Sequence, residues 1–246
     1  MKKWITVRRR IIDFMKFPSK LISGKLIKRY KRFLADVELA NGELVTAHCP
    51  NSGRMTKCQG EGWPVLLSYH GENAKRKLKY TWELVHNGEC WICVNTQRAN
   101  EVAYEAVCEG QISELANYDL VEREKKYAER SRIDLLLRRG DEKCYVEVKS
   151  VSLTEDGRYV FPDAPTERGR KHLDDLLKMK NEGHRAVMLF VLMRSDGSGF
   201  SPAAQIDAKY AEKLKAVHQS GVEVLVYGTK IDEAGICLAE SEKLIL

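Results

Sequence analysis

The chain has 246 residues, which is enough to bury a full hydrophobic core in one domain or in two. Its hydrophobic content of 43% and charged content of 31% are typical of a globular protein and exclude an intrinsically disordered one. The longest uninterrupted apolar stretch, residues 186–193, is too short to span a bilayer and predicts a buried strand, so no membrane partner is expected.

The net charge of +6 is unevenly distributed along the chain. Residues 1–80 carry 18 Lys and Arg against 6 Asp and Glu, whereas residues 81–246 carry 23 against 29. A basic first third is the electrostatic pattern expected of a nucleic-acid-binding element, although solubility alone can also produce a moderate basic bias. We therefore expect DNA, with RNA as a second candidate, to bind mainly through the N-terminal third.

Residues 1–14 are predicted to form a basic N-terminal extension. Charged residues interrupt its apolar ones, so no signal-peptide hydrophobic segment forms. The seven cysteines, an odd number scattered along the chain, argue against a disulfide framework and are typical of a reducing compartment. These features predict a cytoplasmic protein.

Short strands and turns are predicted between residues 21 and 94. Residues 32–39 alternate between apolar and polar side chains, with Phe33 on the apolar face, and Asn41-Gly42 provides a hairpin turn to the next strand. These strands suffice for a small β-barrel of the oligonucleotide-binding (OB) type, which we place at residues 15–95. The individual strands are predicted over residues 32–39, 44–48, 65–69, 80–85 and 91–94.

Two segments of this region have the composition of a nucleic-acid-binding surface. Residues 75–82 interleave four cations with two aromatic residues, which can follow phosphates and stack on bases, although a lysine-protected edge strand has the same composition. The Pro-Asn-Ser-Gly loop at residues 50–53 offers backbone N–H groups to a phosphate but is equally an ordinary turn. The residues predicted to bind nucleic acid here are Lys28, Arg29, Lys31, Arg32, Asn51, Arg54, Lys75, Arg76, Lys77, Lys79, Tyr80 and Trp82.

From residue 96 to residue 246 the pattern changes to alternating strands and helices. An apolar strand on each side of a helix implies parallel pairing through a crossover, and therefore a mixed sheet flanked by helices. Thr166 can cap the second helix of this region. Helices are predicted over residues 100–115, 166–181 and 207–220, and strands over residues 120–127, 132–137, 143–151, 186–193 and 223–227.

Polar residues on the strands around residues 140–141 are the most informative feature of the chain. Gly-Asp is a favourable two-residue hairpin loop and would pair Arg139 with Glu142. Counting outward places Asp134 opposite Glu147, with their Cβ atoms about 5 Å apart. Two like charges at this distance destabilise a sheet unless a positive group lies between them, and a divalent cation is the simplest candidate.

Lys149 follows Glu147 by two residues and therefore lies on the same face of the strand. Mg²⁺ or Mn²⁺ is the expected ion, because such ions take few protein oxygens and complete their shell with water and phosphate. Asp134 and Glu147 would hold the ion while Lys149 orients water or stabilises developing charge, although a structural salt bridge between Glu147 and Lys149 is the alternative. Glu105 is a third candidate ligand, although a solvated helix face also accounts for it.

Arg168 and Lys171 lie in the first turns of the predicted helix that follows this strand, with His172 next to them. Cations at a helix N-terminus oppose the helix dipole, so they suggest that an anion lies nearby. We expect Arg168 and Lys171 to contact a nucleic-acid phosphate, whereas a solvated face above the apolar stripe is the alternative.

The order of these elements resembles known protein families. A strand with Asp, a hairpin, Glu-x-Lys, a helix and a strand resemble the active-site arrangement of restriction-endonuclease-like nucleases, with Ile133 where a proline usually stands. Longer segments are also informative, namely residues 48–55 (HCPNSGRM), 75–85 (KRKLKYTWELV), 131–134 (SRID) and 161–173 (FPDAPTERGRKHL). They resemble the sugar fermentation stimulation protein family, and the resemblance extends from about residue 15 to residue 227. It implies a bacterial DNA-binding protein with an OB-fold domain at residues 15–95, a restriction-endonuclease-like domain at residues 96–246, and a link to maltose metabolism.

Two functions follow from these observations. The first is a Mg²⁺-dependent nuclease that hydrolyses phosphodiester bonds at Asp134, Glu147 and Lys149. The second is a non-catalytic, largely non-specific DNA-binding regulator connected with sugar metabolism. Two opposed carboxylates repel phosphate, so their presence favours the nuclease over a protein that only binds DNA.

Overall fold

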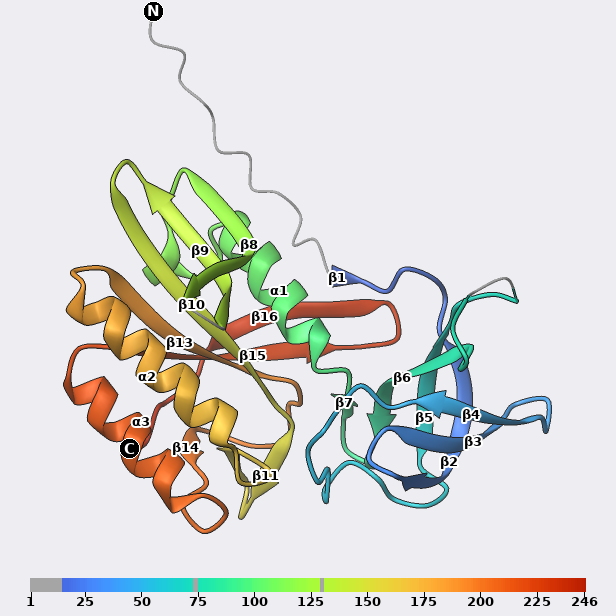
Figure 1. Ribbon diagram of the computed structural model, residues 1–246. Coiled ribbons are helices and arrows are strands. Elements are labelled where there is room, and N and C mark those ends of the chain that lie inside the picture. The colour runs from blue at the N-terminus through green and yellow to red at the C-terminus, as the bar shows by residue number, and fades with distance from the viewer. Residues whose placement is uncertain (1–14, 73–74, 129–130) are drawn as a thin grey trace, which may run out of the picture.

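The computed structural model describes residues 15–72, 75–128 and 131–246, so the predicted extension at residues 1–14 lies outside the described residues. Two regions follow each other along the chain (Figure 1). The first is a β-barrel, and the second is a larger mixed sheet with helices on both faces. This arrangement confirms the predicted fold class.

The barrel is built from five strands that close on themselves. Its strands follow the order β4-β3-β2-β5-β6, and parallel pairing of β4 with β6 closes the ring. A sixth strand, β7, extends the sheet by pairing with β6. The strands are β2 (Ile22–Tyr30), β3 (Leu34–Leu39), β4 (Leu44–His48), β5 (Pro64–Tyr69), β6 (Tyr80–His86) and β7 (Trp91–Cys93).

The interior of the barrel is filled by apolar side chains from alternating strand positions, with the fully buried Trp82 as its largest member. Strand β3 begins two residues later than predicted, because Lys31 and Arg32 form the preceding turn with φ values of 48° and 63°. Phe33 is consequently 47% exposed instead of lying in the core.

The second region is organised around a seven-stranded sheet of order β1-β16-β15-β13-β10-β9-β8. Its centre is parallel, since β13 pairs in parallel with both β10 and β15, and the outer strands are antiparallel. A second, three-stranded sheet has the order β11-β12-β14. The strands are β1 (Met15–Lys16), β8 (Leu120–Ala128), β9 (Ser131–Arg139), β10 (Glu142–Val151), β11 (Leu153–Glu155), β12 (Arg158–Phe161), β13 (Arg185–Leu192), β14 (Phe200–Pro202), β15 (Glu223–Ile231) and β16 (Gly235–Ser241).

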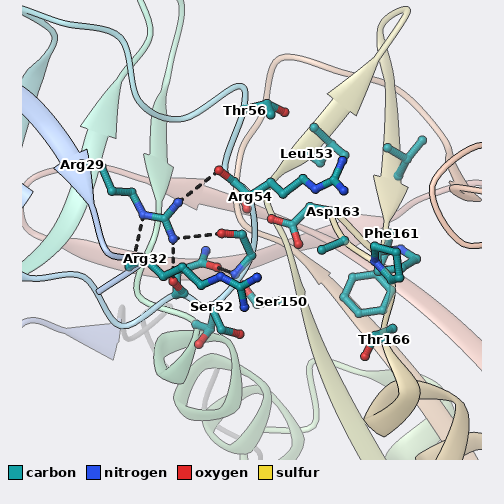
Figure 2. A pocket seen from close by; sticks show the side chains of 18 residues that line it. Arg29, Arg32, Ser52, Arg54, Thr56, Ser150, Leu153, Phe161, Asp163 and Thr166 are labelled. Carbon is teal, nitrogen blue, oxygen red and sulfur yellow. Dashed lines mark hydrogen bonds between the residues drawn. The ribbon is translucent and has the colours of Figure 1, made fainter. Parts of the chain in front are cut away.

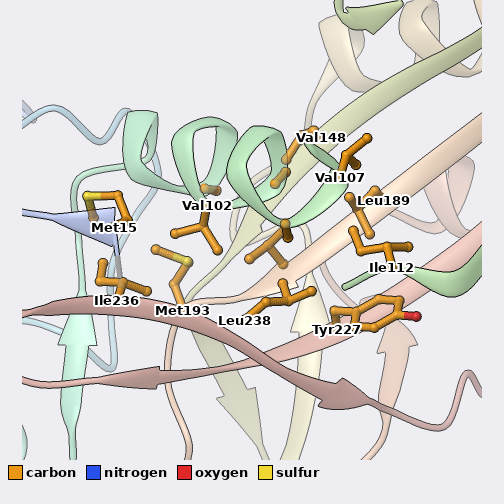
Figure 3. Packing of buried hydrophobic residues seen from close by; sticks show 14 of the residues in the cluster. Met15, Val102, Val107, Ile112, Val148, Leu189, Met193, Tyr227, Ile236 and Leu238 are labelled. Atoms are coloured by element: carbon orange, nitrogen blue, oxygen red, sulfur yellow. The ribbon is translucent and has the colours of Figure 1, made fainter. Parts of the chain in front are cut away.

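Helices cover the two faces of the large sheet and define two cores. Helix α1 (Gln97–Cys108) packs on one face, where Val102 and Val107 share a core with Val148 and Leu189 (Figure 3). Helices α2 (Glu167–Asn181) and α3 (Ala208–Gln219) pack on the other face. No helix among the described residues is long and apolar enough to cross a membrane.

Two features of this region differ from the predictions. The helix predicted over residues 100–115 ends at Cys108, because Gly110 adopts a positive φ of 70°, and a short 3₁₀ turn over Ser113–Leu115 follows. The short strand β1, although it lies at the start of the segment predicted as the barrel domain, pairs with β16 in the large sheet.

Hydrogen bonds between the two regions fix their relative placement. The Asp163 carboxylate accepts the Met55 N–H at 3.2 Å, and Cys58 Sγ donates to the Ser152 carbonyl at 3.3 Å. The Cys93 N–H donates to the Met193 carbonyl at 2.9 Å. The barrel loop that contains Met55 is thereby held against the segment that follows β10.

Candidate functional site

The hairpin of β9 and β10 positions the two predicted acidic residues. Its register pairs Arg139 with Glu142 and Leu136 with Tyr145, as predicted from the Gly-Asp turn. The same register, extended past the last ladder pair, places Asp134 beside Glu147 at the end of the hairpin nearest the barrel. The apolar neighbours of Glu147, including Val148, enter the core beneath α1, so the opposite strand face is free for polar groups.

Asp134 is held in a fixed orientation by two hydrogen bonds. Its Oδ2 accepts the Val148 N–H at 2.8 Å, and its Oδ1 accepts Asn100 Nδ2 at 2.9 Å. The first bond comes from β10 and the second from α1, so the carboxylate joins three elements at one point. A carboxylate fixed in this way is preorganised for a ligand role.

Glu147 is only 2% exposed and contacts two potential cations. Lys149 Nζ donates to Glu147 Oε1 at 2.6 Å, as the shared strand face predicts, and His172 Nδ1 is bonded to the same oxygen. Arg168 Nε donates to His172 Nε2 at 3.3 Å, and Lys149 Nζ lies 3.1 Å from His172 Nδ1, so the ring contacts three charged residues. The second oxygen, Glu147 Oε2, is buried and has no hydrogen-bond partner among the described residues.

The two carboxylates have opposite pKa shifts. Burial and the negative charge of Glu147 raise the pKa of Asp134 to about 6. Burial also opposes ionisation of Glu147, but the hydrogen bond from His172 and the charge of Lys149 outweigh it and lower the pKa of Glu147. Adjacent carboxyl groups with divergent pKa values are typical of functional sites.

These residues fit a divalent cation on two grounds. The Glu147 Oε2 atom is a buried acceptor without a hydrogen-bond partner among the described residues, and burial together with the negative charge of Glu147 raises the pKa of Asp134. No group of three or more His, Cys, Asp and Glu in metal-binding arrangement occurs among the described residues. Two carboxylates nevertheless suffice for Mg²⁺, which retains water and substrate phosphate in its shell.

A cavity of about 910 Å³ lies in front of this pair. Arg168 and Lys171 line it, whereas Glu105 is not among its lining residues. Ten further residues line the cavity that the sequence did not predict for the site. Among them, Asn100, Glu124, Arg132 and His172 lie on four different elements, α1, β8, β9 and α2, which only the fold brings together.

The residues predicted to bind nucleic acid in the barrel fall into two groups. In the first group, the side chain is buried or makes hydrogen bonds within the protein. The Trp82 indole is 0% exposed and donates to the Leu84 carbonyl at 2.9 Å, so it cannot stack on a base, and we correct this assignment. Asn51 is 6% exposed, and its side chain accepts the Gly53 N–H at 2.8 Å, which makes it a turn residue.

Arg29 also serves the structure, because its guanidinium donates to four backbone carbonyls of the turns at residues 32 and 51–54. The second group has charged or aromatic side chains at the surface. Lys79 and Tyr80 are half-buried, with the Tyr80 ring centroid 5.1 Å from that of Tyr69. The exposed members are Lys28, Lys31, Arg32, Arg54, Lys75, Arg76 and Lys77.

The fold and this site define a two-domain protein in which an OB-type barrel precedes a restriction-endonuclease-like domain. Residues 27–94 match the family model described as SfsA N-terminal OB domain, and residues 97–235 match that described as Sugar fermentation stimulation protein RE domain. The chain therefore belongs to the sugar fermentation stimulation protein family.

Individual relatives are similar over most of the chain. A sugar fermentation stimulation protein homolog from Marinomonas sp. (strain MWYL1) is 51% identical over 235 residues, which cover 94% of this chain and 91% of that protein. The homolog from Geotalea uraniireducens (strain Rf4) is 49% identical over 222 residues, covering 90% and 96%. The Pyrococcus furiosus SfsA structure in complex with Ca²⁺ shares the fold, with a TM-score of 0.86, 24% identity, and coverage of 96% of this chain and 100% of that one.

Proposed function

We propose that this protein binds DNA, with RNA as a second candidate, and hydrolyses its phosphodiester bonds in a reaction that requires Mg²⁺ or Mn²⁺. The observation that carries the proposal is the buried, unpartnered Glu147 Oε2 beside Asp134, in a cavity that cations also line. A site that only bound phosphate would have no use for two carboxylates in this position, because they repel the ligand.

Asp134 and Glu147 would hold the divalent cation. When bound, the cation supplies Lewis-acid polarisation of the phosphate. The Pyrococcus furiosus relative, whose structure is a complex with Ca²⁺, supports the assignment of a divalent ion to this fold. Arg168 and Lys171, on the wall of the cavity, would bind the phosphates next to the one that is cleaved.

Lys149 is the candidate catalytic residue of the chain. Its ammonium lies 2.6 Å from Glu147 Oε1 on the cavity wall, where it can orient the attacking water and stabilise negative charge on the phosphate. Water attacks phosphorus and gives up a proton, the bond from phosphorus to the leaving sugar oxygen breaks, and that oxygen takes up a proton from solvent, so no net proton is gained or lost in these two transfers. His172 is a positioning residue, because its contacts with Lys149 and Glu147 hold both side chains in place.

Cleavage assays on full-length protein test the proposal. We expect single-stranded or duplex DNA or RNA to be cleaved with Mg²⁺ or Mn²⁺ and not with EDTA. Lys149→Ala should slow cleavage by about 100-fold while DNA affinity changes by less than about twofold. The matched control is Lys143→Ala, on the same strand but outside the cavity lining, which should cleave normally.

The alternative function is a non-catalytic DNA-binding regulator connected with sugar (maltose) metabolism. It is favoured by the ion pair of Lys149 with Glu147, which can also serve a structural role. This alternative would stand if the wild type bound DNA but cleaved no substrate with either metal. In that case Lys149→Ala should weaken DNA binding as much as the loss of one barrel lysine does.

A further inference from the structure

A second cavity, of about 680 Å³, lies next to the carboxylate cavity between the barrel and the C-terminal domain. The two cavities share the lining residues Ser52, Thr96, Ser150 and Phe161. The volume is in the range of sites that hold a small organic ligand. A nucleic-acid strand that passes Asp134 and Glu147 can therefore place its next nucleotide in this second cavity.

The walls of this cavity differ in chemistry (Figure 2). The barrel wall carries Arg32 and Arg54, together with the Ser52 hydroxyl. The opposite wall combines the apolar Leu153 and Phe161 with the Asp163 carboxylate. A nucleotide complements these two walls, because its anionic phosphate can bind the arginines while the flat face of its base stacks on an aromatic ring.

The cationic wall is fixed before any ligand binds. The Arg29 guanidinium donates to the carbonyls of Arg32, Asn51 and Gly53 at 2.9 Å and to that of Arg54 at 3.1 Å. These hydrogen bonds stabilise the turn at Arg32, whose positive φ of 63° is unfavourable for a residue other than glycine. The donors of Arg29 are thus used internally, and the exposed Arg32 and Arg54 remain to meet a ligand.

The wall that carries Phe161 is equally rigid. The Phe161 ring centroid lies 5.3 Å from that of Tyr210 and 5.6 Å from that of Phe190, so its position is set by the core. The two walls are joined at Asp163, whose carboxylate accepts the Met55 N–H. Gly53 is required there, because a Cβ on it would overlap that carboxylate.

We propose that this cavity binds one unpaired nucleotide of a nucleic-acid strand, with its base against Phe161 and its phosphate against Arg32 and Arg54. The inference rests on the proposed function, because it identifies single-stranded nucleic acid as the substrate class of the same site. A base that is stacked and paired in a duplex must leave the stack to enter such a cavity. The cavity therefore selects single strands, frayed ends or loops over intact duplex.

Binding to fluorescent DNA in EDTA tests this, because the readout does not require cleavage. The probes are a mixed-sequence single strand of about 12 nucleotides and the matching duplex. Ala164→Trp would fill the cavity without changing charge, and Arg32→Asn would remove a cation while keeping a residue that tolerates the left-handed turn. The matched controls are Ala204→Trp and Arg158→Asn, which change exposed residues outside the cavity.

We expect Ala164→Trp to weaken single-strand binding by about tenfold and duplex binding by less than about twofold. A further test uses a series of DNA single strands, each lacking one base at a different position. One of these strands should bind the wild type about as weakly as the intact strand binds Ala164→Trp, and it should bind Ala164→Trp no more weakly than the intact strand does. Thermal melting verifies that each variant is folded, and Arg32→Asn, at the surface, provides the test if Ala164→Trp is not.

Single-strand affinities of Ala164→Trp and Arg32→Asn equal to those of their controls would overturn the proposal. The outcome is distinguishable from failure of the nuclease assignment. Selective loss of single-strand binding without any wild-type cleavage would support the nucleotide cavity and reject the nuclease. Metal-dependent cleavage with unchanged single-strand binding in both variants would support the nuclease and reject the nucleotide cavity.

Discussion

Each of the two domains contains one buried glutamate among the described residues, and the comparison between them separates structure from function. Glu83 in the barrel is 1% exposed, and Glu147 in the large sheet is 2% exposed. Both are paired with cations, since Arg98 Nη2 lies 2.8 Å from Glu83 Oε1 and Lys149 Nζ lies 2.6 Å from Glu147 Oε1. By burial and charge alone the two residues are alike.

The difference lies in how completely each carboxylate is satisfied. Both oxygens of Glu83 are bonded, because Ser68 donates to Oε1, Asn95 donates to Oε2 and Arg98 contacts both. These bonds connect strand β6 to the start of α1 and join the two domains. Glu147 instead leaves one buried oxygen without a partner. A carboxylate that only stabilises the fold uses all of its acceptors, whereas one that binds a ligand keeps a position open.

The largest expected effect tests this comparison through stability. Glu83→Gln should lower the free energy of unfolding by about 3–5 kcal/mol, because it breaks a buried ion pair and leaves less negative charge to balance the guanidinium of Arg98. Glu147→Gln should lower it by less, about 1–2 kcal/mol in EDTA, since the loss of the pair with Lys149 is partly offset by the removal of repulsion with Asp134. Urea denaturation of both variants provides the measurement. Equal losses would show that Glu147 is as structural as Glu83.

The second prediction concerns metal binding at the open position. Asp134→Asn should weaken Mn²⁺ binding by at least about 100-fold, equivalent to about 2.7 kcal/mol, because it removes one of two charged ligands. The asparagine can still accept the Val148 N–H, so the melting temperature in EDTA should be unchanged or higher. Calorimetric titration measures the affinity, with Asp141→Asn in the exposed hairpin turn as the control. Unaltered Mn²⁺ affinity in Asp134→Asn would remove the metal site.

A third carboxylate, Asp196, gives an intermediate effect that depends on pH. Burial opposes its ionisation, but the hydrogen bond and charge of Arg194 dominate and lower the pKa of Asp196 to about 2. A lowered acid pKa stabilises the folded state above the unfolded value of about 4, and this stability disappears as the pH falls toward 2. The wild type should therefore lose about 2 kcal/mol more than Asp196→Asn between pH 4 and pH 2. Parallel acid unfolding curves for the two proteins would contradict the assignment.

The smallest effects are expected for exposed cations that belong to neither buried network. Lys77→Ser should change the free energy of unfolding by less than about 0.5 kcal/mol. It should reduce the slope of log DNA affinity against log salt concentration by about 1, because one phosphate contact is lost. Lys230→Ser, an exposed lysine outside the barrel, is the control and should leave the slope unchanged. An equal change in both variants would mean that the barrel has no particular role in binding.

Local rules accounted for the elements of the site. The Gly-Asp turn determined the register of β9 and β10 and so placed Asp134 near Glu147, because strand pairing counts outward from the turn. Period-two alternation put Lys149 on the face of Glu147, and the Thr166 hydroxyl caps α2 by accepting the Gly169 N–H. Each of these inferences depends on residues that are close in sequence.

The errors came where distant segments compete for the same space. Trp82 was predicted to stack on bases because it follows a run of cations. It lies instead at an inward position of the closed barrel, where burial of its large apolar indole stabilises the core. Strand β1 is too short to predict, and its place beside β16 depends on an edge formed some 220 residues later in the chain.

The sequence by itself determined the two fold classes, the acidic hairpin and the family, because turn chemistry, periodicity and long motifs are local properties. Only the tertiary structure decided which neighbours each site residue has. It brought His172 from α2 to Glu147 and left Glu147 Oε2 without a partner. It also set the arginine turns of the barrel opposite Phe161. These outcomes depend on packing between elements, which no spacing along the chain specifies.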